Sequence, residues 1–382
     1  MKITLIGPVY PYRGGISQYH SQLAKALIDN NHEVQIISFK RQYPIWLYPG
    51  KTDKDPSPPI VSIEAIFILD PINPITWFST IKKVRKFKPD KIIIQWWTTF
   101  WAPAYAFIAY ALRKRFSISY LIHNVFPHER RFFDSFFAKF ALNPADSFIV
   151  LTSREKERLR LFIRSAKDIE VCSIPPNTML NHFRISKNEA RKQLNLDIDI
   201  PVILFFGLVR PYKGLKYLID AIHLLKIQGF TTIKLVIAGE FWEDPEIYYN
   251  QIKKLGLNNN AIIHNRYISN EELAKFLSAA DLFVAPYIGG TQSGTIKLAM
   301  GFNLPIIATD EISADLREID YPNLVVIPAK NPKALRDAIC SVISQTGDLA
   351  EELLPQPNNE WQEFISRLEK VSNNLRLKKQ GE

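Results

Sequence analysis

Short apolar runs alternate with longer amphipathic segments along most of the chain, and this alternation constrains the fold more than any other feature. A first series begins with the apolar run at 2–7 and continues to about residue 152. After the polar stretch 184–199, a second series begins at Pro201. Such alternation is typical of parallel sheets whose strands are connected by helices. Since 382 residues suffice for two domains, we predict an α/β protein with two doubly wound, Rossmann-like domains.

The apolar runs predict where the strands lie. In the first half we expect strands at 2–7, 33–39, 91–97, 118–124 and 146–152, and in the second half at 201–207, 233–239, 260–267, 281–287 and 304–309. We place the first domain at 1–190 and the second at 191–355, with a helix in 356–382. Ligands of such folds bind where strands end and helices begin, and two domains in tandem imply a cleft between them.

The net charge of +10 is concentrated in the first half of the chain. Residues 1–190 contain 27 Lys and Arg against 15 Asp and Glu, a net charge of +12, with basic clusters at 81–91, 113–115 and 154–164. Each cluster is compatible with a solvated helix face, and three of them together also favour an anionic partner. No nucleic-acid-binding module is evident, so we predict no nucleic-acid partner.

Cysteine usage and apolar segments indicate the compartment. Cys172 and Cys340 are isolated from each other and from any metal-ligand spacing, which fits a reducing cytoplasm without disulfides or zinc. The first ten residues show no secretory signal, and the longest apolar stretch, 96–112, is too short and mixed for a bilayer span. We therefore predict a cytoplasmic protein.

Three glycine-containing junctions between a predicted strand and a predicted helix are candidate anion sites. They lie at 7–19 with Gly14, Gly15 and the predicted N-cap Ser17; at 205–218 with Arg210, Lys213 and Gly214; and at 284–309 with Gly290, Thr291, Gln292, Ser293 and Gly294. Backbone N–H groups and the helix dipole favour anions at such junctions, although each is also compatible with a simple turn.

The charged residues of the second junction narrow the class of ligand. No G-x-x-x-x-G-K-[ST] and no G-x-G-x-x-G occurs, which argues against an ATPase of the P-loop type and against a standard nicotinamide dehydrogenase. Arg210 can bind a diphosphate through its forked guanidinium and Lys213 as a point charge. A nucleoside diphosphate is the leaving group that suits this pair.

The ordered set of motifs resembles a known family over nearly the whole chain. Segments 207–225, 235–240 and 279–309 resemble the C-terminal half of the retaining nucleotide-sugar glycosyltransferases of family four, which have the two-domain GT-B fold. Segments 11–27, 121–124 and 145–159 are similar to the N-terminal half of the same family. The resemblance implies transfer of a sugar from a nucleoside-diphosphate donor held by the second domain. It also implies that the C-terminal helix crosses back onto the first domain, whereas its simpler role would be to cap the second.

The resemblance assigns roles to individual residues. Arg210 and Lys213 match the pair on the donor diphosphate, Gly15 with Gly14 matches a loop that approaches the same phosphates, and His123 matches a histidine at the donor sugar. His123, Arg210 and Lys213 are thus the candidate catalytic residues, while His123 is also compatible with a buried histidine of structural role. The acceptor-side candidates are Tyr12, Arg13, His128 and Glu129.

The third junction departs from the pattern of many family members, which carry two glutamates seven residues apart. Gly290 and Leu298 stand at those positions, and the segment resembles the subgroup with a Thr-Gln-Ser-Gly loop at 291–294. Backbone N–H groups and the hydroxyls of Thr291 and Ser293 would then contact sugar and phosphate. Glu240, Lys297 or nearby backbone are the candidates for ribose recognition.

The resemblance implies a retaining reaction with a UDP- or GDP-sugar as co-substrate and no cofactor or obligatory metal. No Asp-x-Asp motif suited to a nucleotide-sugar site follows a strand, because Leu196–Pro201 falls between the domains. Arg210, Lys213 and helix N-termini would stabilise the leaving group, and domain closure would exclude water.

We expect the acceptor to bind to the basic first half of the chain. Segment 95–115 combines Trp96, Trp97, Phe100 and Trp101 with Arg113, Lys114 and Arg115, which suits an interfacial segment on an anionic membrane and equally a buried helix with a basic cap. We predict a lipid-linked or membrane-proximal glycan acceptor, in surface polysaccharide or glycoconjugate biosynthesis, and peripheral attachment to the inner face of the membrane. The competing hypothesis is a catalytically inactive GT-B protein that binds nucleotide sugars or serves as a scaffold.

Overall fold

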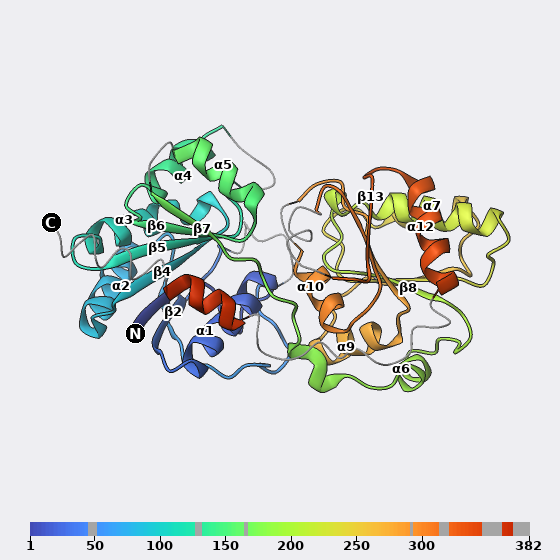
Figure 1. Ribbon diagram of the computed structural model, residues 1–382, viewed down its shortest axis with the longest axis horizontal. Coiled ribbons are helices and arrows are strands. Elements are labelled where there is room, and N and C mark those ends of the chain that lie inside the picture. The colour runs from blue at the N-terminus through green and yellow to red at the C-terminus, as the bar shows by residue number, and fades with distance from the viewer. Residues whose placement is uncertain are drawn as a thin grey trace. The chain divides into compact units, whose positions relative to one another are not determined.

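The computed structural model describes residues 1–44, 52–126, 132–163, 167–290, 293–312, 321–345 and 361–369. The chain divides into two compact units, Met1–Ile174 with Asn358–Glu382, and Pro175–Pro357. Each contains a parallel sheet covered by helices (Figure 1). The prediction of two doubly wound α/β domains is confirmed.

The first unit is built on a seven-stranded sheet of order β3-β2-β1-β4-β5-β6-β7. Its strands are β1 (Lys2–Ile6), β2 (Glu33–Phe39), β3 (Ile66–Leu69), β4 (Lys91–Trp96), β5 (Ser117–Ile122), β6 (Ser147–Val150) and β7 (Asp168–Val171). Its helices are α1 (Gly15–Asp29), α2 (Pro74–Phe87), α3 (Ala102–Leu112), α4 (Asp134–Leu142) and α5 (Ser153–Ile163). All six residues of β4 are buried, as expected for a central parallel strand with both faces covered.

The second unit has a six-stranded sheet of order β10-β9-β8-β11-β12-β13. Its strands are β8 (Val202–Phe206), β9 (Lys234–Ala238), β10 (Ala261–His264), β11 (Leu282–Ala285), β12 (Ile306–Thr309) and β13 (Leu324–Ile327). Its helices are α6 (Lys187–Gln193), α7 (Leu215–Ile227), α8 (Glu246–Lys254), α9 (Asn270–Ala279), α10 (Gly294–Gly301) and α12 (Pro332–Gln345), and the short 3₁₀ helix η4 spans Pro211–Lys213. The strands that were not predicted, β3, β7 and β13, lie at sheet edges and are only partly buried.

The two units meet along the chain at Ile174 and Pro175, earlier than the predicted boundary at residue 190. The segment after Pro175 packs against α10 of the second unit. The Asn177 N–H donates to the carbonyl of Lys297 at 2.8 Å, and a Cβ on Gly301 would lie 2.0 Å from the Asn177 carbonyl oxygen. This close backbone contact assigns the segment to the second unit although the apolar pattern restarts only at Pro201.

The C-terminal helix, residues 361–369, belongs to the first unit. Phe364, Ile365 and Leu368 are buried in the same cluster as Leu23 and Leu27 of α1. Figure 1 shows this helix in red beside α1. The helix therefore covers the face of the first sheet that α1 covers, and the helices α2 to α5 cover the other face.

The aromatic residues predicted to be interfacial are mainly core residues. Trp96 and Trp101 are fully buried in the cluster between the first sheet and α3, and Trp97 and Phe100 pack against it. For Trp96 and Trp101 the buried alternative is the correct one, whereas Trp97 and Phe100 are only partly buried. Within the described ranges, no helix combines the length and the apolar character needed to cross a bilayer.

Candidate functional site

The junction after β8 places Arg210 and Lys213 at the carboxyl end of the second sheet. Arg210 precedes η4 and Lys213 ends it, and Gly214, with a left-handed φ of 69°, is the N-cap of α7. A Cβ at Gly214 would lie 1.9 Å from the carbonyl oxygen of Pro286, so only glycine allows this loop to pack against the end of β11. The Arg210 guanidinium lies 5.5 Å from the ring centre of Trp242, which follows β9.

Lys213 is buried and held by the segment that follows β11. Its Nζ donates to the hydroxyl of Tyr287 at 2.5 Å and lies 3.9 Å from the centre of that ring. The Tyr287 hydroxyl is also within hydrogen-bond distance of Ser293 Oγ (3.0 Å) and Thr295 Oγ1 (2.9 Å), which lie 2.8 Å apart. Four side chains from two junctions thus form one hydrogen-bonded cluster, which fixes the position of a cation.

The cluster lies at the N-terminus of α10. Ser293 is the N-cap of this helix, and its Oγ accepts from the Ile296 N–H at 3.3 Å, while Gly294 is the first helical residue. The positive end of the helix dipole therefore adds to the charge of Lys213. Gly290, with φ of 133°, precedes the cap, whereas Thr291 and Gln292 lie outside the described residues.

Tyr287 and Thr295 are members of this cluster that the sequence did not indicate. Burial raises the pKa of the Tyr287 phenol, but the Lys213 charge and the hydrogen bonds from Lys213, Ser293 and Thr295 lower it by more, so the net shift is downward. The tyrosine hydroxyl is thus polarised by the cation. Tyr287 was read as the end of an apolar strand, and no spacing rule distinguishes it from a core tyrosine.

The ribose candidates lie near this junction. The carbonyl of Glu240 accepts from the Val209 N–H at 3.0 Å, and Lys297 is buried within α10. Gly290 and Leu298 stand at the positions that the family resemblance assigns to the two glutamates, and Leu298 is a buried core residue. Among the residues that the structure describes, no three His, Cys, Asp or Glu side chains gather as a metal site.

In the first unit, His123 follows β5 in a buried polar cluster. Its Nε2 donates to the Gln95 side-chain oxygen at 2.5 Å, its backbone N–H donates to the Trp96 carbonyl, and the Tyr19 ring packs edge-on against the imidazole at 5.4 Å. Desolvation by burial and then the nearby His20 lower the pKa of His123 to about 3. The imidazole is therefore neutral near pH 7, with the proton on Nε2.

Gln95, His20 and Tyr19 complete this cluster and were not predicted. His20 Nδ1 donates to the Pro8 carbonyl at 3.0 Å, and a Cβ at Gly7 would lie 2.5 Å from the Gln95 Cγ atom. Within the described residues, Gln95 Nε2, His20 Nε2 and the Tyr19 hydroxyl have no hydrogen-bond partner. Buried polar groups are normally paired, so these atoms mark a place where a polar ligand or water can bind.

The two buried histidines predict acid sensitivity of the first unit. Burial also lowers the pKa of His20, to about 4, so the folded chain leaves His20 and His123 unprotonated at pH values where the unfolded chain, with pKa near 6.5, binds protons. The stabilisation is complete above about pH 6.5 and is lost as the pH falls, by up to about 1.4 kcal/mol per pH unit for each histidine. In urea titrations at pH 7, 6 and 5, we expect a steeper loss for wild type than for His20→Gln/His123→Gln. Replacement of the exposed His182 by Gln serves as the control, and equal slopes for wild type and the double variant would contradict the assignment.

The loop before α1 is arranged partly as predicted. Gly14, with φ of 103°, is the N-cap, and the helix begins at Gly15; Ser17 is a buried residue of the first turn and not the cap. A Cβ at either glycine would meet no atom within 4 Å, so the backbone there is open to a ligand.

The acceptor-side candidates receive less support from their positions. Tyr12 is a core residue whose hydroxyl donates to the carbonyl of Phe39, the last residue of β2, at 2.7 Å. Arg13 donates to the Thr52 carbonyl at 2.8 Å. His128 and Glu129 lie outside the described residues.

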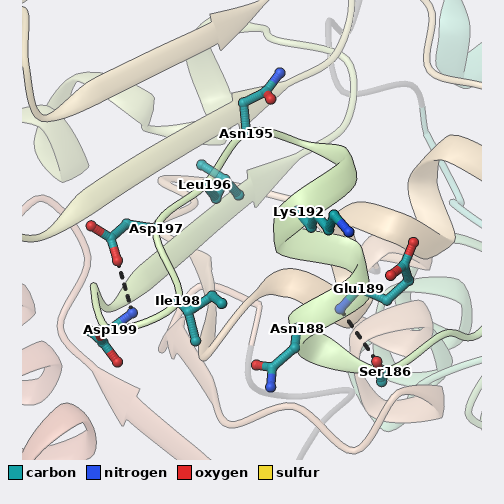
Figure 2. Close-up of a pocket in the computed structure, with 9 residues that line it drawn as sticks. All are labelled: Ser186, Asn188, Glu189, Lys192, Asn195, Leu196, Asp197, Ile198 and Asp199. Carbon is teal, nitrogen blue, oxygen red and sulfur yellow. Dashed lines mark hydrogen bonds between the residues drawn. The ribbon is translucent and has the colours of Figure 1, made fainter.

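Figure 2 shows a surface pocket of about 640 Å³ around α6 in the second unit. It is lined by residues of 186–199, and none of them belongs to the predicted site. Two of its backbone groups are bound within the lining, since the Glu189 N–H donates to Ser186 and the Asp199 N–H donates to Asp197. The pocket is therefore a hollow beside a capped helix and is separate from the Lys213 cluster.

Comparison with family models covers both units. The model of "Glycosyltransferase Family 4" matches residues 13–174, and the model of "Glycosyl transferases group 1" matches residues 200–345. The chain belongs to the group 1 glycosyltransferases. The match includes both junctions of the Lys213 cluster and the strand end at His123, so the residues singled out by their geometry lie within the glycosyltransferase domains.

Individual relatives are distant. The chain is 24% identical over 215 residues to the D-inositol 3-phosphate glycosyltransferase of Xylanimonas cellulosilytica, which covers 53% of this chain and 50% of that protein. It is 27% identical over 126 residues to the GDP-mannose:glycolipid 4-beta-D-mannosyltransferase of Xanthomonas campestris pv. campestris, covering 33% and 35%. The chain thus spans about half the length of the first of these curated glycosyltransferases and about a third of the second.

Solved structures resemble the chain over its whole length. Sucrose-phosphate synthase from Thermosynechococcus elongatus aligns with a TM-score of 0.67 and 19% identity, covering 100% of this chain and 99% of the other. Anabaena Alr3699/HepE in complex with UDP-glucose aligns with a TM-score of 0.69 and 16% identity, covering 98% and 99%. At these identities the similarity shows the GT-B glycosyltransferase fold.

Proposed function

We propose that this chain transfers a sugar from a nucleoside-diphosphate sugar to an acceptor, with retention of anomeric configuration. The observation that carries the proposal is the buried Lys213, held by Tyr287, Ser293 and Thr295 at the N-terminus of α10. A fixed cation, a helix dipole and the neighbouring Arg210 suit the charge that develops on a leaving diphosphate. The name of the HepE complex states that this structural neighbour holds UDP-glucose, which supports the choice of a UDP- or GDP-sugar as donor.

In this proposal Arg210 and Lys213 supply the positive charge, so that no cofactor or obligatory metal is required. His123, neutral and with its proton on Nε2, contacts the transferred sugar, and the open backbone at Gly14 and Gly15 approaches the donor phosphates. Gly290, Ser293 and Gly294 present backbone and hydroxyl groups to the donor, together with Thr291 and Gln292. Glu240 or Lys297 remains our candidate for the ribose.

For the acceptor we propose a lipid-linked or membrane-proximal glycan used in surface polysaccharide or glycoconjugate biosynthesis, with a cytoplasmic protein attached peripherally to the inner membrane face. The curated relative from Xanthomonas acts on a glycolipid according to its name, and the first half of this chain is strongly basic. Both observations favour an acceptor at an anionic membrane surface.

A second candidate function is an inactive GT-B protein that binds nucleotide sugars without transferring them. The specific observation in its favour is that Gly290 and Leu298 replace the two glutamates common in the family. Both candidates are expected to bind the donor, but only the enzyme is expected to transfer its sugar.

A thermal-shift panel of UDP, GDP, ADP and their common sugars tests donor binding. We expect one diphosphate series to raise the melting temperature, since a ligand at one hundred times its Kd contributes about 2.7 kcal/mol to folding stability. Arg210→Ala/Lys213→Ala should lose this shift. Absence of any shift would contradict both candidate functions.

Turnover of the donor identified in this way separates the two candidates, and its products test the finer assignments. Sugar transfer to a glycolipid acceptor, followed by ¹H NMR of the new anomeric centre, reports retention or inversion. The same reaction with EDTA reports any need for a metal. Donor binding without transfer to any of a panel of lipid-linked acceptors would favour the scaffold.

A further inference from the structure

Three neighbouring helices of the first unit carry an exposed aromatic surface. The helices α2 and α3 pack side by side, as do α3 and α4, and all three cover the same face of the sheet (Figure 1). Large apolar side chains on their outer sides are exposed: Ile75, Phe78, Phe107, Phe136 and Phe140. We call this surface the α2–α4 face. Contiguous exposed apolar patches of this kind mark interaction sites.

The aromatic rings on the α2–α4 face form a continuous strip. Phe78 of α2 contacts Phe107 of α3 with ring centres 5.0 Å apart, and Tyr110 of α3 contacts Phe140 of α4 at 5.7 Å. Phe107 and Tyr110 are three residues apart on α3 and so lie on one side of that helix. A hollow of about 630 Å³ follows the strip and is lined by Trp77, Pro103, Phe107, Tyr110, Ala111 and Phe140.

Exposed cations, without exposed carboxylates, accompany the strip. The basic residues on the three helices and in the turn after α3 are Lys82, Lys83, Arg85, Lys86, Arg113, Lys114, Arg115 and Lys139, and all are exposed. Asp134 is the single carboxylate of these described helices, and it is buried and hydrogen-bonded to Thr99. The face is therefore apolar and uniformly positive.

We propose that the α2–α4 face docks on an anionic lipid bilayer, with its aromatic side chains in the headgroup region and its cations on lipid phosphates. Exposed aromatics interleaved with Lys and Arg match the chemistry of an anionic membrane surface. A symmetric second copy of this chain is disfavoured as the occupant, because two uniformly positive faces would then meet. The side chains that contact the bilayer in this proposal lie on the outer surfaces of α2, α3 and α4. Trp96 and Trp101 are buried and are not among them.

The inference rests on the proposed function, because docking on a bilayer brings the enzyme to a membrane-proximal acceptor. Binding to vesicles is measured without donor or acceptor, so it does not depend on activity. Vesicle binding with no response to any nucleotide would contradict the transferase proposal alone. A nucleotide response without vesicle binding would contradict this inference alone.

Co-sedimentation of the full chain with vesicles tests the inference. We expect binding to phosphatidylcholine vesicles that contain 30% phosphatidylglycerol and little binding to phosphatidylcholine alone, with weakening as salt is raised. Lys82→Gln/Lys83→Gln/Lys114→Gln should lower the partition coefficient about a hundredfold, since each basic residue near an anionic surface contributes about fivefold. Phe78→Ser/Phe136→Ser should lower it tenfold or more.

Matched controls come from the second unit. Phe78 and Phe136 are 61% and 70% exposed, and Ile227 and Ile247 are 68% and 55% exposed, so Ile227→Ser/Ile247→Ser removes comparable apolar surface elsewhere. Melting temperatures of all variants report whether they fold. Equal loss of binding in the control, or no preference for anionic vesicles in wild type, would overturn the proposal. So would a concentration-dependent dimer that dissociates in Phe78→Ser/Phe136→Ser, because it would assign the face to a second copy.

Discussion

Replacement of Lys213 by alanine is expected to lower kcat/KM for sugar transfer by about 10³, the magnitude typical of removing one preorganised electrostatic group. The Nζ of Lys213 is fixed by the Tyr287 hydroxyl and lies at the N-terminus of α10, so its position is set before any ligand binds. Steady-state kinetics with the donor found in the thermal-shift panel measure the effect.

Two companion variants show whether the loss belongs to the cation itself. Lys216→Ala removes an exposed lysine from the adjoining first turn of α7, and we expect its kcat/KM to stay close to wild type. Tyr287→Phe keeps the aromatic ring but removes the acceptor of the Lys213 hydrogen bond, and a loss of about tenfold is expected. Since Tyr287 still bonds to Ser293 and Thr295 when Lys213 is absent, Lys213→Ala should fold. A change in kcat/KM of less than threefold in Lys213→Ala would contradict the assigned role.

The strands at the centre of both sheets were predictable because parallel strands buried on both faces produce uninterrupted apolar runs. β4 and β8 are examples: their positions follow from the sequence to within about one residue at each end. The edge strands β3 and β13 are partly exposed runs of only four apolar residues, and a run this short does not by itself specify a strand. The boundary at Pro175 was missed for a different reason, since it depends on contact between Asn177 and α10 and not on any local pattern.

The candidate site residues that belong to a recognisable sequence motif could be predicted. The residues that hold them in place could not. Arg210 and Lys213 were indicated by their place in the second junction and then by the motif resemblance, and His123 by the resemblance alone. Tyr287 and Gln95 were missed, because each is an ordinary residue at a strand end until the fold brings it to Lys213 or His123. Likewise α3 is apolar on nearly every side, so its sequence does not show that only Pro103, Phe107 and Tyr110 among its large side chains reach the outer surface. That information comes from how α2 and α4 pack around it.

Replacement of Trp101 by alanine is expected to destabilise the first unit by about 3–5 kcal/mol, the usual cost of removing a fully buried Trp or Phe side chain. Trp101 has no exposed surface, and its ring centre lies 4.1 Å from that of Phe39 and 5.3 Å from that of Phe100. The cavity left by the indole is bounded by the sheet and α3 and cannot collapse without moving both. Calorimetry is the appropriate measurement, because it shows whether a chain of two units unfolds in one transition or in several.

Phe78→Ala provides the contrasting result and links stability to membrane docking. Because Phe78 is mostly exposed, its replacement should change the free energy of unfolding by no more than about 0.5 kcal/mol while weakening vesicle binding. Trp101→Ala should do the opposite at a temperature where it remains folded: a large loss of stability and unchanged partition to anionic vesicles. If Trp101→Ala instead reduced vesicle binding without loss of stability, then segment 95–101 would be the interfacial element and the α2–α4 face would not.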